Sequence, residues 1–156
     1  FPPDQVQDPR ELREPGKGLN RDPVRTPMAW DESANSGFSS GPPWLPLHAD
    51  WQSRNVARER HCEGSMWQLY RDLLTLRREL PALSLGSWRA VAAEGTVLAY
   101  ERQLGDERSL IALNLGDAPA PFHRPDWAAA LHPQLSTTYE GFADNMLAPN
   151  QGVIFA

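Results

Sequence analysis

Two arginines, Arg21 and Arg25, are the side chains of this sequence best suited to recognising a ligand. They lie in a strip, residues 21–31, in which Pro23 and Pro27 each hold the backbone φ angle at about −65°, so the strip should be stiff. A guanidinium group presents its N–H donors as a planar fork that pairs with carboxylates or vicinal hydroxyls in ways that lysine does not. The strip therefore predicts either a binding surface for a polar ligand or a loop held by structural salt bridges, and the residues alone favour neither.

Acidic side chains in the first region are the next candidates, because acid/base catalysis needs two carboxyl groups held a few ångströms apart in a cleft. The candidates are Asp4, Asp8, Glu11, Glu14, Asp22, Asp31 and Glu32. No periodic element surrounds them, so the sequence predicts no rigid framework that would hold a pair together. We expect solvated or structural carboxylates here and predict no catalytic residue in this chain.

Thiol and metal chemistry are less well supported. His61 and Cys62 are adjacent, but neighbouring residues do not face each other on a helix or strand, and no third group is apparent that would orient them. The four histidines have no metal-ligand spacing. Residues 31–37 resemble a calcium loop, but the glycine comes one position late and Pro42 stands in the place of the bidentate glutamate. We therefore expect no metal site and no cofactor.

The six tryptophans could form a stacking site, since the flat faces of sugars pack on indole rings. Trp88 and Trp127 lie in the later part of the chain, and the other four lie in or near the first region. Tryptophans are more often core or subdomain contacts, so ligand stacking is the less favoured alternative for each of them.

The composition is that of a globular chain with no obvious nucleic-acid or membrane partner. Of the 156 residues 40% are hydrophobic and the formal net charge is −5, with no cluster of Lys and Arg that would bind nucleic acid. No apolar run approaches the ~20 residues that span a bilayer. Cys62 is the single cysteine, which excludes an internal disulfide and favours a reducing compartment, so we expect a cytoplasmic protein. The chain begins Phe1-Pro2-Pro3, with neither a methionine nor a signal-peptide pattern, and we expect a processed product or a piece of a longer protein.

Three kinds of segment must position these side chains. Residues 1–62 are rich in proline and show no sustained period, which excludes long helices and central strands. Residues 65–80 carry apolar side chains at helical spacing, begin at the N-cap candidate Ser65 and are stopped by Pro81. From Gly86 the hydrophobic period shifts to two, with glycine-containing turns between short segments.

The alternating segments predict short strands, of which residues 96–115 form the best hairpin. The expected strands are Trp88–Ala93, Thr96–Gln103, Ser109–Leu115, Leu135–Tyr139 and Gly152–Phe155. The expected fold class is therefore mainly β, with a small antiparallel sandwich that follows one helix and a long loop excursion.

The strip at residues 21–31 is similar to the RDPxRTPMQWD segment of α-glucosidases, oligo-1,6-glucosidases and trehalose synthases of the α-amylase superfamily. Further motifs of that family follow in the same order through about residue 115, and the remainder is similar in texture. They are Asn35-Ser36-Gly37-Phe38, Pro43-Trp44-Leu45-Pro46, Asn55-Val56, Tyr70-Arg71-Asp72-Leu73-Leu74, Leu76-Arg77-Arg78 and Pro81-Ala82-Leu83 with Gly86. Residues 2–16 resemble the segment after the last barrel strand. Asn20 and Ala29 depart from the family pattern, which often has Gly at the first position and usually has Gln at the second.

The resemblance implies a C-terminal antiparallel β-sandwich preceded by the end of a (β/α)8 barrel. Residues 1–85 would be the end of the catalytic barrel, with a loop excursion at 1–62 after strand eight and the last barrel helix at 65–80, and residues 86–156 would be the sandwich domain. Active-site loops lie at the C-terminal ends of barrel strands, so residues 1–62 would border the sugar pocket. By position in the motif, Arg21 would lie beside the aglycone subsite and Arg25 would bind the non-reducing glucose.

The resemblance also implies a fragment of a retaining, exo-acting α-glucosidase that hydrolyses short α-glucosides. The catalytic Asp, Glu and Asp of the family lie upstream and none of their motifs occurs here, so the chain alone is expected to be inactive. Its expected partners are an α-glucoside and the missing N-terminal portion of the barrel, in the same or a separate chain. Two alternatives stay open: a trehalose synthase or sucrose-acting transglycosidase as parent, and a non-catalytic sugar-binding or structural β-sandwich module with Trp88 and Trp127 as stacking candidates.

Overall fold

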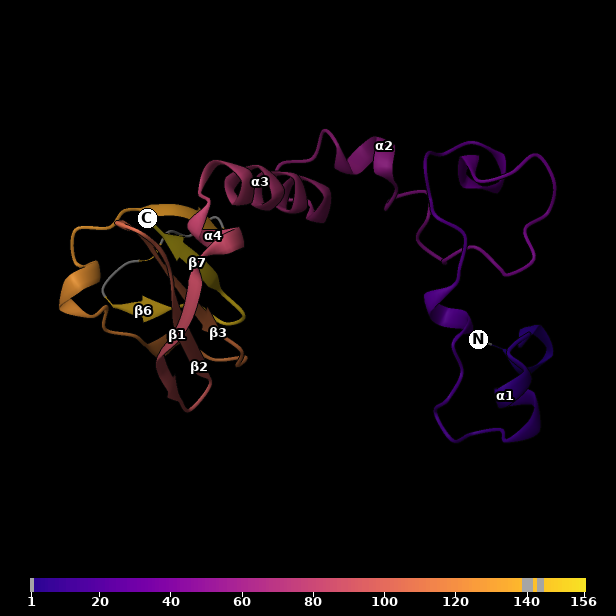
Figure 1. Ribbon diagram of the computed structural model, residues 1–156. Coiled ribbons are helices and arrows are strands. Elements are labelled where there is room, and N and C mark those ends of the chain that lie inside the picture. Colours follow the sequence, from indigo (N-terminus) through magenta and orange to yellow (C-terminus); the bar gives the residue numbers. More distant parts are fainter. Residues whose placement is uncertain (1, 139–141, 143–144) are drawn as a thin grey trace. The chain divides into compact units, whose positions relative to one another are not determined.

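The computed structural model describes residues 2–138, 142 and 145–156 of the chain (Figure 1). It divides into two compact units, a first unit of Phe1–Trp67 and a second unit of Gln68–Ala156. The two units differ in what fills their interiors, because the first contains many prolines and few apolar runs and the second contains the alternating segments.

Short helices joined by irregular chain make up the first unit. They are the 3-10 helices η1 (Pro3–Gln5), η2 (Asp22–Val24) and η3 (Ala34–Gly37) and the α-helices α1 (Pro9–Arg13) and α2 (Val56–Glu59). Pro3, Pro9 and Pro23 lie in the first turns of η1, α1 and η2, where proline is tolerated because no intrahelical N–H is needed. The prediction that this region holds no long helix is confirmed within the described residues.

The buried residues of the first unit are mainly polar. They are Asp8, Asp22, Ser36, Leu45 and Asn55. Hydrogen bonds to buried polar side chains are therefore prominent in this unit, in which Leu45 is the one fully buried large apolar side chain among the described residues.

Asn55 shows how these hydrogen bonds shape the unit. Its Oδ1 accepts the backbone N–H of Arg58 at 3.0 Å and caps α2, and its Nδ2 donates to the carbonyl of Trp51 at 3.0 Å. The start of α2 is also joined to residues 29 and 30, because the N–H of Val56 donates to the carbonyl of Ala29 at 3.0 Å. The end of the arginine strip is thereby fixed to α2.

The long helix α3 (Met66–Glu79) corresponds to the helix expected at residues 65–80. The carboxylate of Glu59 accepts the N–H of Trp67 at 3.2 Å and supports the beginning of this helix. Pro81 follows its end, and the short helix α4 (Ala82–Leu85) comes next. A Cβ atom at Gly86 would lie 2.5 Å from the carbonyl oxygen of Ala82, so this close approach of the backbone favours glycine.

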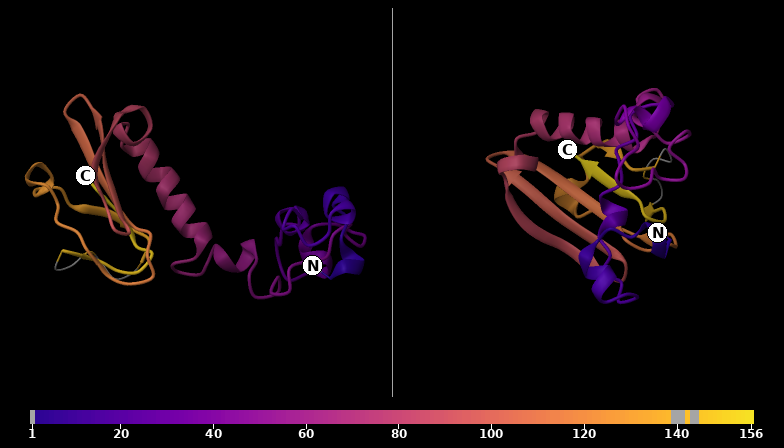
Figure 2. Two further views of the ribbon diagram at one scale, coloured as in Figure 1. Left: turned by 90° about the horizontal axis from the view of Figure 1, so that it is seen from below. Right: turned by 90° about the vertical axis from the view of Figure 1, so that its right-hand side faces the viewer.

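Two antiparallel sheets form the rest of the second unit (Figures 1 and 2). The strands are β1 (Ser87–Glu94), β2 (Val97–Leu104), β3 (Glu107–Asn114), β4 (Ala120–Pro121), β5 (Pro133–Ser136), β6 (Met146–Leu147) and β7 (Gly152–Phe155), with a 3-10 helix η4 at Asp126–Ala128. One sheet has the order β1-β2-β3-β7-β5 and the other pairs β4 with β6.

The strands predicted from the alternating pattern agree with the five-stranded sheet, and the hairpin expected at 96–115 is β2 and β3. The expected end of one strand, Tyr139, lies outside the described residues. Strands β4 and β6 were not expected, because two residues are too few to display a period.

The core of the second unit contains side chains from both sheets. Pairing of Ala99 with Ala112, and of Leu110 with Phe155, puts these residues on one face of the large sheet. This face packs with Ala120 and Leu147 of the small sheet in one apolar cluster. The sheets make up most of the regular structure after Gly86, in agreement with the short antiparallel strands that the sequence predicts there.

Candidate functional site

Arg21 is held by Asp8, thirteen residues away in the sequence. Arg21 Nε donates to Asp8 Oδ2 at 3.0 Å, Arg21 Nη2 donates to Asp8 Oδ1 at 3.4 Å, and the backbone N–H of Arg21 donates to Oδ2 at 3.0 Å. Asp8 also caps α1 by accepting the N–H of Arg10 at 2.9 Å. Its side chain is completely buried, whereas 58% of the Arg21 side chain remains exposed.

These contacts keep Asp8 ionised. The hydrogen bond from the Arg21 side chain, together with those from the backbone N–H groups of Arg10 and Arg21, holds the pKa of Asp8 well below its usual range, although burial alone would raise it. Arg21 is therefore paired with a permanent negative charge at neutral pH.

Asp22 supports this pair from the other side. Its Oδ2 accepts the backbone N–H groups of Gln7 at 2.7 Å and Asp8 at 2.9 Å. Asp22 is itself buried, and its Oδ1 has no partner among the described residues. The two aspartates thus join the segment at residues 7–10 to the segment at residues 20–22.

Arg25 lies four residues beyond Arg21 but outside this network. Its backbone N–H donates to the carbonyl of Asp22 at 2.9 Å and closes η2. Its side chain is exposed and makes no hydrogen bond or ion pair within the described part of the chain. The structure therefore fixes one of the two candidate arginines and leaves the other open to solvent.

A pocket of about 320 Å³ with both polar and apolar walls borders the second half of the arginine strip. It is lined by Thr26, Pro27, Met28, Ala29, His48, Asp50, Arg54, Asn55, Val56 and Glu59. Within it the pKa of Asp50 is lowered, first by the contact with His48 and, against the effect of burial, also by Arg54, whose Nη1 lies 3.1 Å from Oδ2. Three side chains of this wall, His48, Asp50 and Arg54, are therefore already paired with one another.

The remaining carboxylate of the strip, Asp31, has a local structural role. It accepts hydrogen bonds from the Ser33 hydroxyl and from the Ser33 N–H at 2.8 Å, and these lower its pKa against the effect of burial. A Cβ atom at Gly37, where φ is +67°, would lie 2.8 Å from the Asp31 carboxylate, so the loop closes around this side chain. Across the residues that are described, no group of three His, Cys, Asp or Glu is arranged to hold a metal ion.

The two tryptophans considered for stacking differ in their surroundings. Trp88 is 57% exposed and lies in a tilted contact with Tyr100, with ring centroids 6.0 Å apart. Trp127 is partly buried, and the guanidinium carbon of Arg108 lies 3.8 Å from its ring centroid. One face of Trp127 is therefore covered, and Trp88 is the more accessible of the pair.

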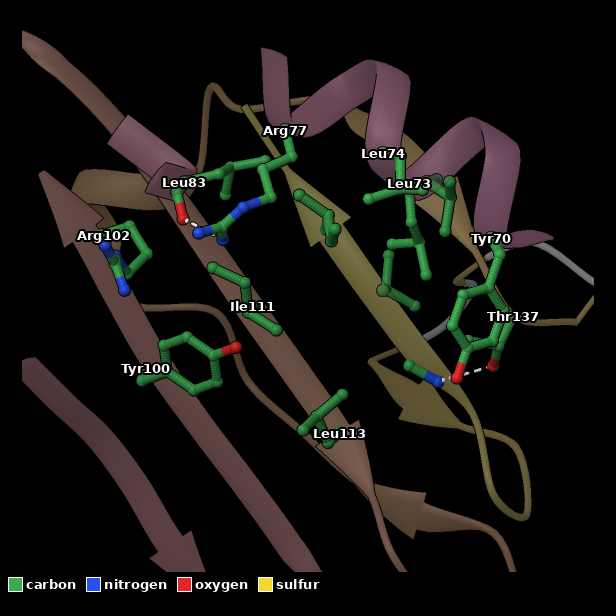
Figure 3. Close-up of a pocket in the computed structure, with 14 residues that line it drawn as sticks. Tyr70, Leu73, Leu74, Arg77, Leu83, Tyr100, Arg102, Ile111, Leu113 and Thr137 are labelled. Carbon is green, nitrogen blue, oxygen red and sulfur yellow. Dashed lines mark hydrogen bonds between the residues drawn. The ribbon is translucent and has the colours of Figure 1, made fainter. Parts of the chain in front are cut away.

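A second cavity, of about 440 Å³, lies between α3 and the outer face of the large sheet (Figure 3). Its walls include Tyr70 and Leu74 from α3 and Tyr100, Ile111 and Leu113 from the sheet, so they are largely apolar. The sequence did not predict this cavity, because it depends on how the helix packs against the sheet.

The single cysteine, Cys62, is exposed, and its Sγ lies 3.7 Å from the carbonyl oxygen of Glu63. No helix within the described residues is long and apolar enough to cross a membrane.

Comparison with known proteins shows which family the chain is similar to. The model of the alpha-amylase catalytic domain matches residues 2–86. An oligo-1,6-glucosidase from Parageobacillus thermoglucosidasius is 31% identical over 121 residues, which cover 77% of this chain and 22% of that protein.

Two solved enzyme structures are also similar to this chain in sequence and fold. The trehalulose synthase from Pseudomonas mesoacidophila MX-45 is 34% identical with a TM-score of 0.76, over 87% of this chain and 26% of that one, and a variant of it has been solved with its substrate sucrose. The isomaltulose synthase from Klebsiella sp. LX3 is 30% identical with a TM-score of 0.78, over 87% of this chain and 25% of that one. The present chain thus spans between a fifth and about a quarter of the length of these relatives.

Proposed function

Because the chain belongs to the alpha-amylase family, we propose that it is one part of a retaining, exo-acting α-glucosidase that hydrolyses short α-glucosides. In this proposal residues 1–85 complete the catalytic barrel and residues 86–156 form its C-terminal sandwich domain. The shared apolar core of the two sheets supports the second assignment, and the family match over residues 2–86 supports the first.

The proposal rests chiefly on Arg21, which is fixed in direction and yet more than half exposed. A guanidinium that is already oriented loses little conformational entropy when it binds, so it is suited to hydroxyl groups of a sugar. We assign Arg21 to the aglycone side of the substrate and the exposed Arg25 to the non-reducing glucose.

The catalytic carboxyl groups belong, in this proposal, to another part of the protein. A retaining glycosidase needs two carboxyl groups about 5 Å apart, one of which has a raised pKa so that it can donate a proton. Every described carboxyl group whose pKa is clearly shifted has a lowered pKa: Asp8, Asp31, Asp50 and Glu101. Each of them is paired locally, so none of these four is suited to donate a proton.

The test uses the full-length polypeptide that carries residues 1–156, assayed for release of glucose from maltose and isomaltose. We expect Arg25→Ala to raise the KM for maltose by about tenfold or more, the scale of a lost charge-assisted hydrogen bond. The exposed Arg13→Ala, on α1, is the matched control and should behave as wild type. A wild-type protein that releases no glucose from either disaccharide would refute the proposed function.

A sucrose-acting transglycosidase is the second candidate, because two of the solved relatives are a trehalulose synthase and an isomaltulose synthase. The products of the reaction with sucrose separate the two candidates. Glucose and fructose in equal amounts indicate hydrolysis, whereas an isomeric disaccharide indicates transfer. A trehalose synthase would instead convert maltose to trehalose without net release of glucose.

A non-catalytic sugar-binding module is the remaining alternative, and the exposed ring of Trp88 is its best support. Titration of the chain with maltooligosaccharides, followed by tryptophan fluorescence, discriminates it from a purely structural role. Saturable quenching that disappears in Trp88→Ala would favour sugar binding. The expected cytoplasmic location rests on the single cysteine and stays a prediction.

A further inference from the structure

We propose that Asp8 is a positioning residue for substrate binding, because its buried carboxylate determines the direction in which Arg21 presents its remaining N–H donors. The inference rests on the proposed function, in which Arg21 contacts the aglycone side of an α-glucoside. Asp8 itself does not touch the sugar in this proposal and acts only through Arg21.

The geometry of the pair defines which donors remain. Arg21 uses the edge formed by Nε and Nη2, whose distances to the Asp8 oxygens are 3.0 and 3.4 Å. A guanidinium group has five N–H donors, so both donors of Nη1 and the second donor of Nη2 are left over. These lie at the end of the side chain, where a planar pair of N–H groups matches two vicinal hydroxyls.

Asp8 can hold this direction because it is itself immobilised. It receives hydrogen bonds from the N–H groups of Arg10 and Arg21 in addition to the guanidinium, and its own N–H donates to Asp22. Any other position of this buried carboxylate would leave several of these donors without a partner. The exposed Arg21 side chain, by contrast, would sample several rotamers if its partner were removed.

A purely structural clamp would make a different prediction. If Asp8 only tied two loops together, its loss would lower the stability of the first unit and leave substrate affinity unchanged in the folded protein. A positioning role requires a higher KM in a folded protein, with a kcat that changes little, and requires Arg21 for the effect.

The experiment compares Asp8→Asn and Asp8→Ser in the full-length polypeptide, with maltose as substrate. Serine keeps the cap of α1 but cannot reach the guanidinium, so it separates the cap from the ion pair. We expect both variants to raise the KM by about tenfold and to change kcat by less than about twofold, the scale of one charge-assisted hydrogen bond. Glu14→Gln, which removes the exposed carboxylate paired with Lys17 at 3.3 Å, is the control and should match wild type.

The decisive comparison places Asp8→Ser in an Arg21→Ala background. We expect no further rise in KM there, because the guanidinium that Asp8 directs is absent. An equal rise in both backgrounds, or an unchanged KM in the single variants, would overturn the positioning role while the proposed function stands.

Arg21→Lys keeps the proposal testable if the Asp8 variants do not fold. Lysine preserves the charge beside Asp8 but lacks the second, outward pair of donors, so we expect a KM raised as in Asp8→Ser, and a wild-type KM would overturn the inference. A wild-type protein without activity on maltose, isomaltose or sucrose would refute the proposed function and the role of Asp8 together.

Discussion

At the scale of single residues, two buried carboxylates form ion pairs that orient arginine side chains. Asp8 and Glu101 are both almost completely inaccessible, and Asp8 pairs with one arginine whereas Glu101 pairs with two. Burial of a carboxylate is costly unless charge-assisted hydrogen bonds offset it. The ion pairs with these two buried carboxylates therefore restrict the conformations of their arginine partners.

Glu101 provides the clearest test of this arrangement. Its Oε2 accepts from Arg89 Nε at 2.7 Å and its Oε1 accepts from Arg108 Nε at 2.5 Å. We expect Glu101→Gln to lower the free energy of unfolding of the sheet unit by about 1–3 kcal/mol, because the charge is lost while the shape is kept. Thermal or urea unfolding of the chain measures the effect, and Glu94→Gln, an exposed carboxylate on β1, is the control.

The same residue predicts a pH dependence. Burial raises the pKa of Glu101, but the hydrogen bonds from Arg89 and Arg108 outweigh it and leave the pKa below its ordinary value of 4.5. A lowered pKa means that the unfolded chain binds a proton more readily than the folded one, so the contribution of Glu101 is present above pH 4.5 and is lost as the pH falls through the folded pKa.

We therefore expect the stability difference between wild type and Glu101→Gln to shrink as the pH is lowered from 6 toward 3. Urea unfolding at a series of pH values measures this difference. A difference that stays constant over the series would mean that the pKa of Glu101 is the same in the folded and the unfolded state.

At the scale of elements, the junction between α4 and β1 constrains the second unit most tightly. Glu107 accepts the backbone N–H of Ala82 at 2.6 Å, and Arg102 Nη2 donates to the carbonyl of Gly86 at 2.8 Å. These contacts attach the end of the helical segment to the hairpin of β2 and β3. They also bring the backbone so close at Gly86 that a side chain there would force neighbouring backbone atoms to shift.

Gly86→Ala is expected to destabilise the second unit by about 1–3 kcal/mol, since the three nearest atoms are all backbone atoms of Ala82 and Gln103, which cannot move independently of the helix and sheet. Gly41→Ala is the matched control, because a Cβ atom there meets nothing within 4 Å. Melting temperatures of the two variants check the prediction. Equal temperatures would mean that the junction is looser than the structure indicates.

At the scale of the whole molecule, the interiors of the two units are stabilised by different interactions. The first has a polar interior of hydrogen-bonded aspartate, asparagine and serine, and the second has an apolar cluster shared by two sheets. The first unit also carries both candidate sugar-binding arginines. The part of the chain that is proposed to bind substrate is thus the part that has little hydrophobic core of its own.

The chain of 156 residues, produced alone, should release no glucose from maltose or from p-nitrophenyl α-glucoside. The physical reason is that a proton donor needs a raised pKa, whereas the four described carboxyl groups with a clearly shifted pKa, Asp8, Asp31, Asp50 and Glu101, all have a lowered one. The same assay on the full-length polypeptide is the positive control. Turnover by the short chain that persists after repeated purification would contradict the division of roles proposed above.

Much of the second unit could be predicted from the sequence. Helical spacing and Pro81 placed α3 within one residue at each end, and alternation with glycine turns placed the five strands of the large sheet. The order of short motifs also identified the family. These features are encoded locally, because periodicity, turn residues and motifs each involve residues that are close in the chain.

Only the tertiary structure decided which of the seven candidate carboxylates matter. Asp8 and Asp22 are buried and the other five are not. Both directly precede a proline in the sequence, but so does the exposed Glu14, so this neighbourhood does not single them out. The partner of Asp8 lies thirteen residues away across an irregular loop, and an ion pair between two such loops has no period. The sequence by itself therefore determined the family, the helix and the hairpin, whereas the pairing that directs Arg21 depends on how the two loops pack in space.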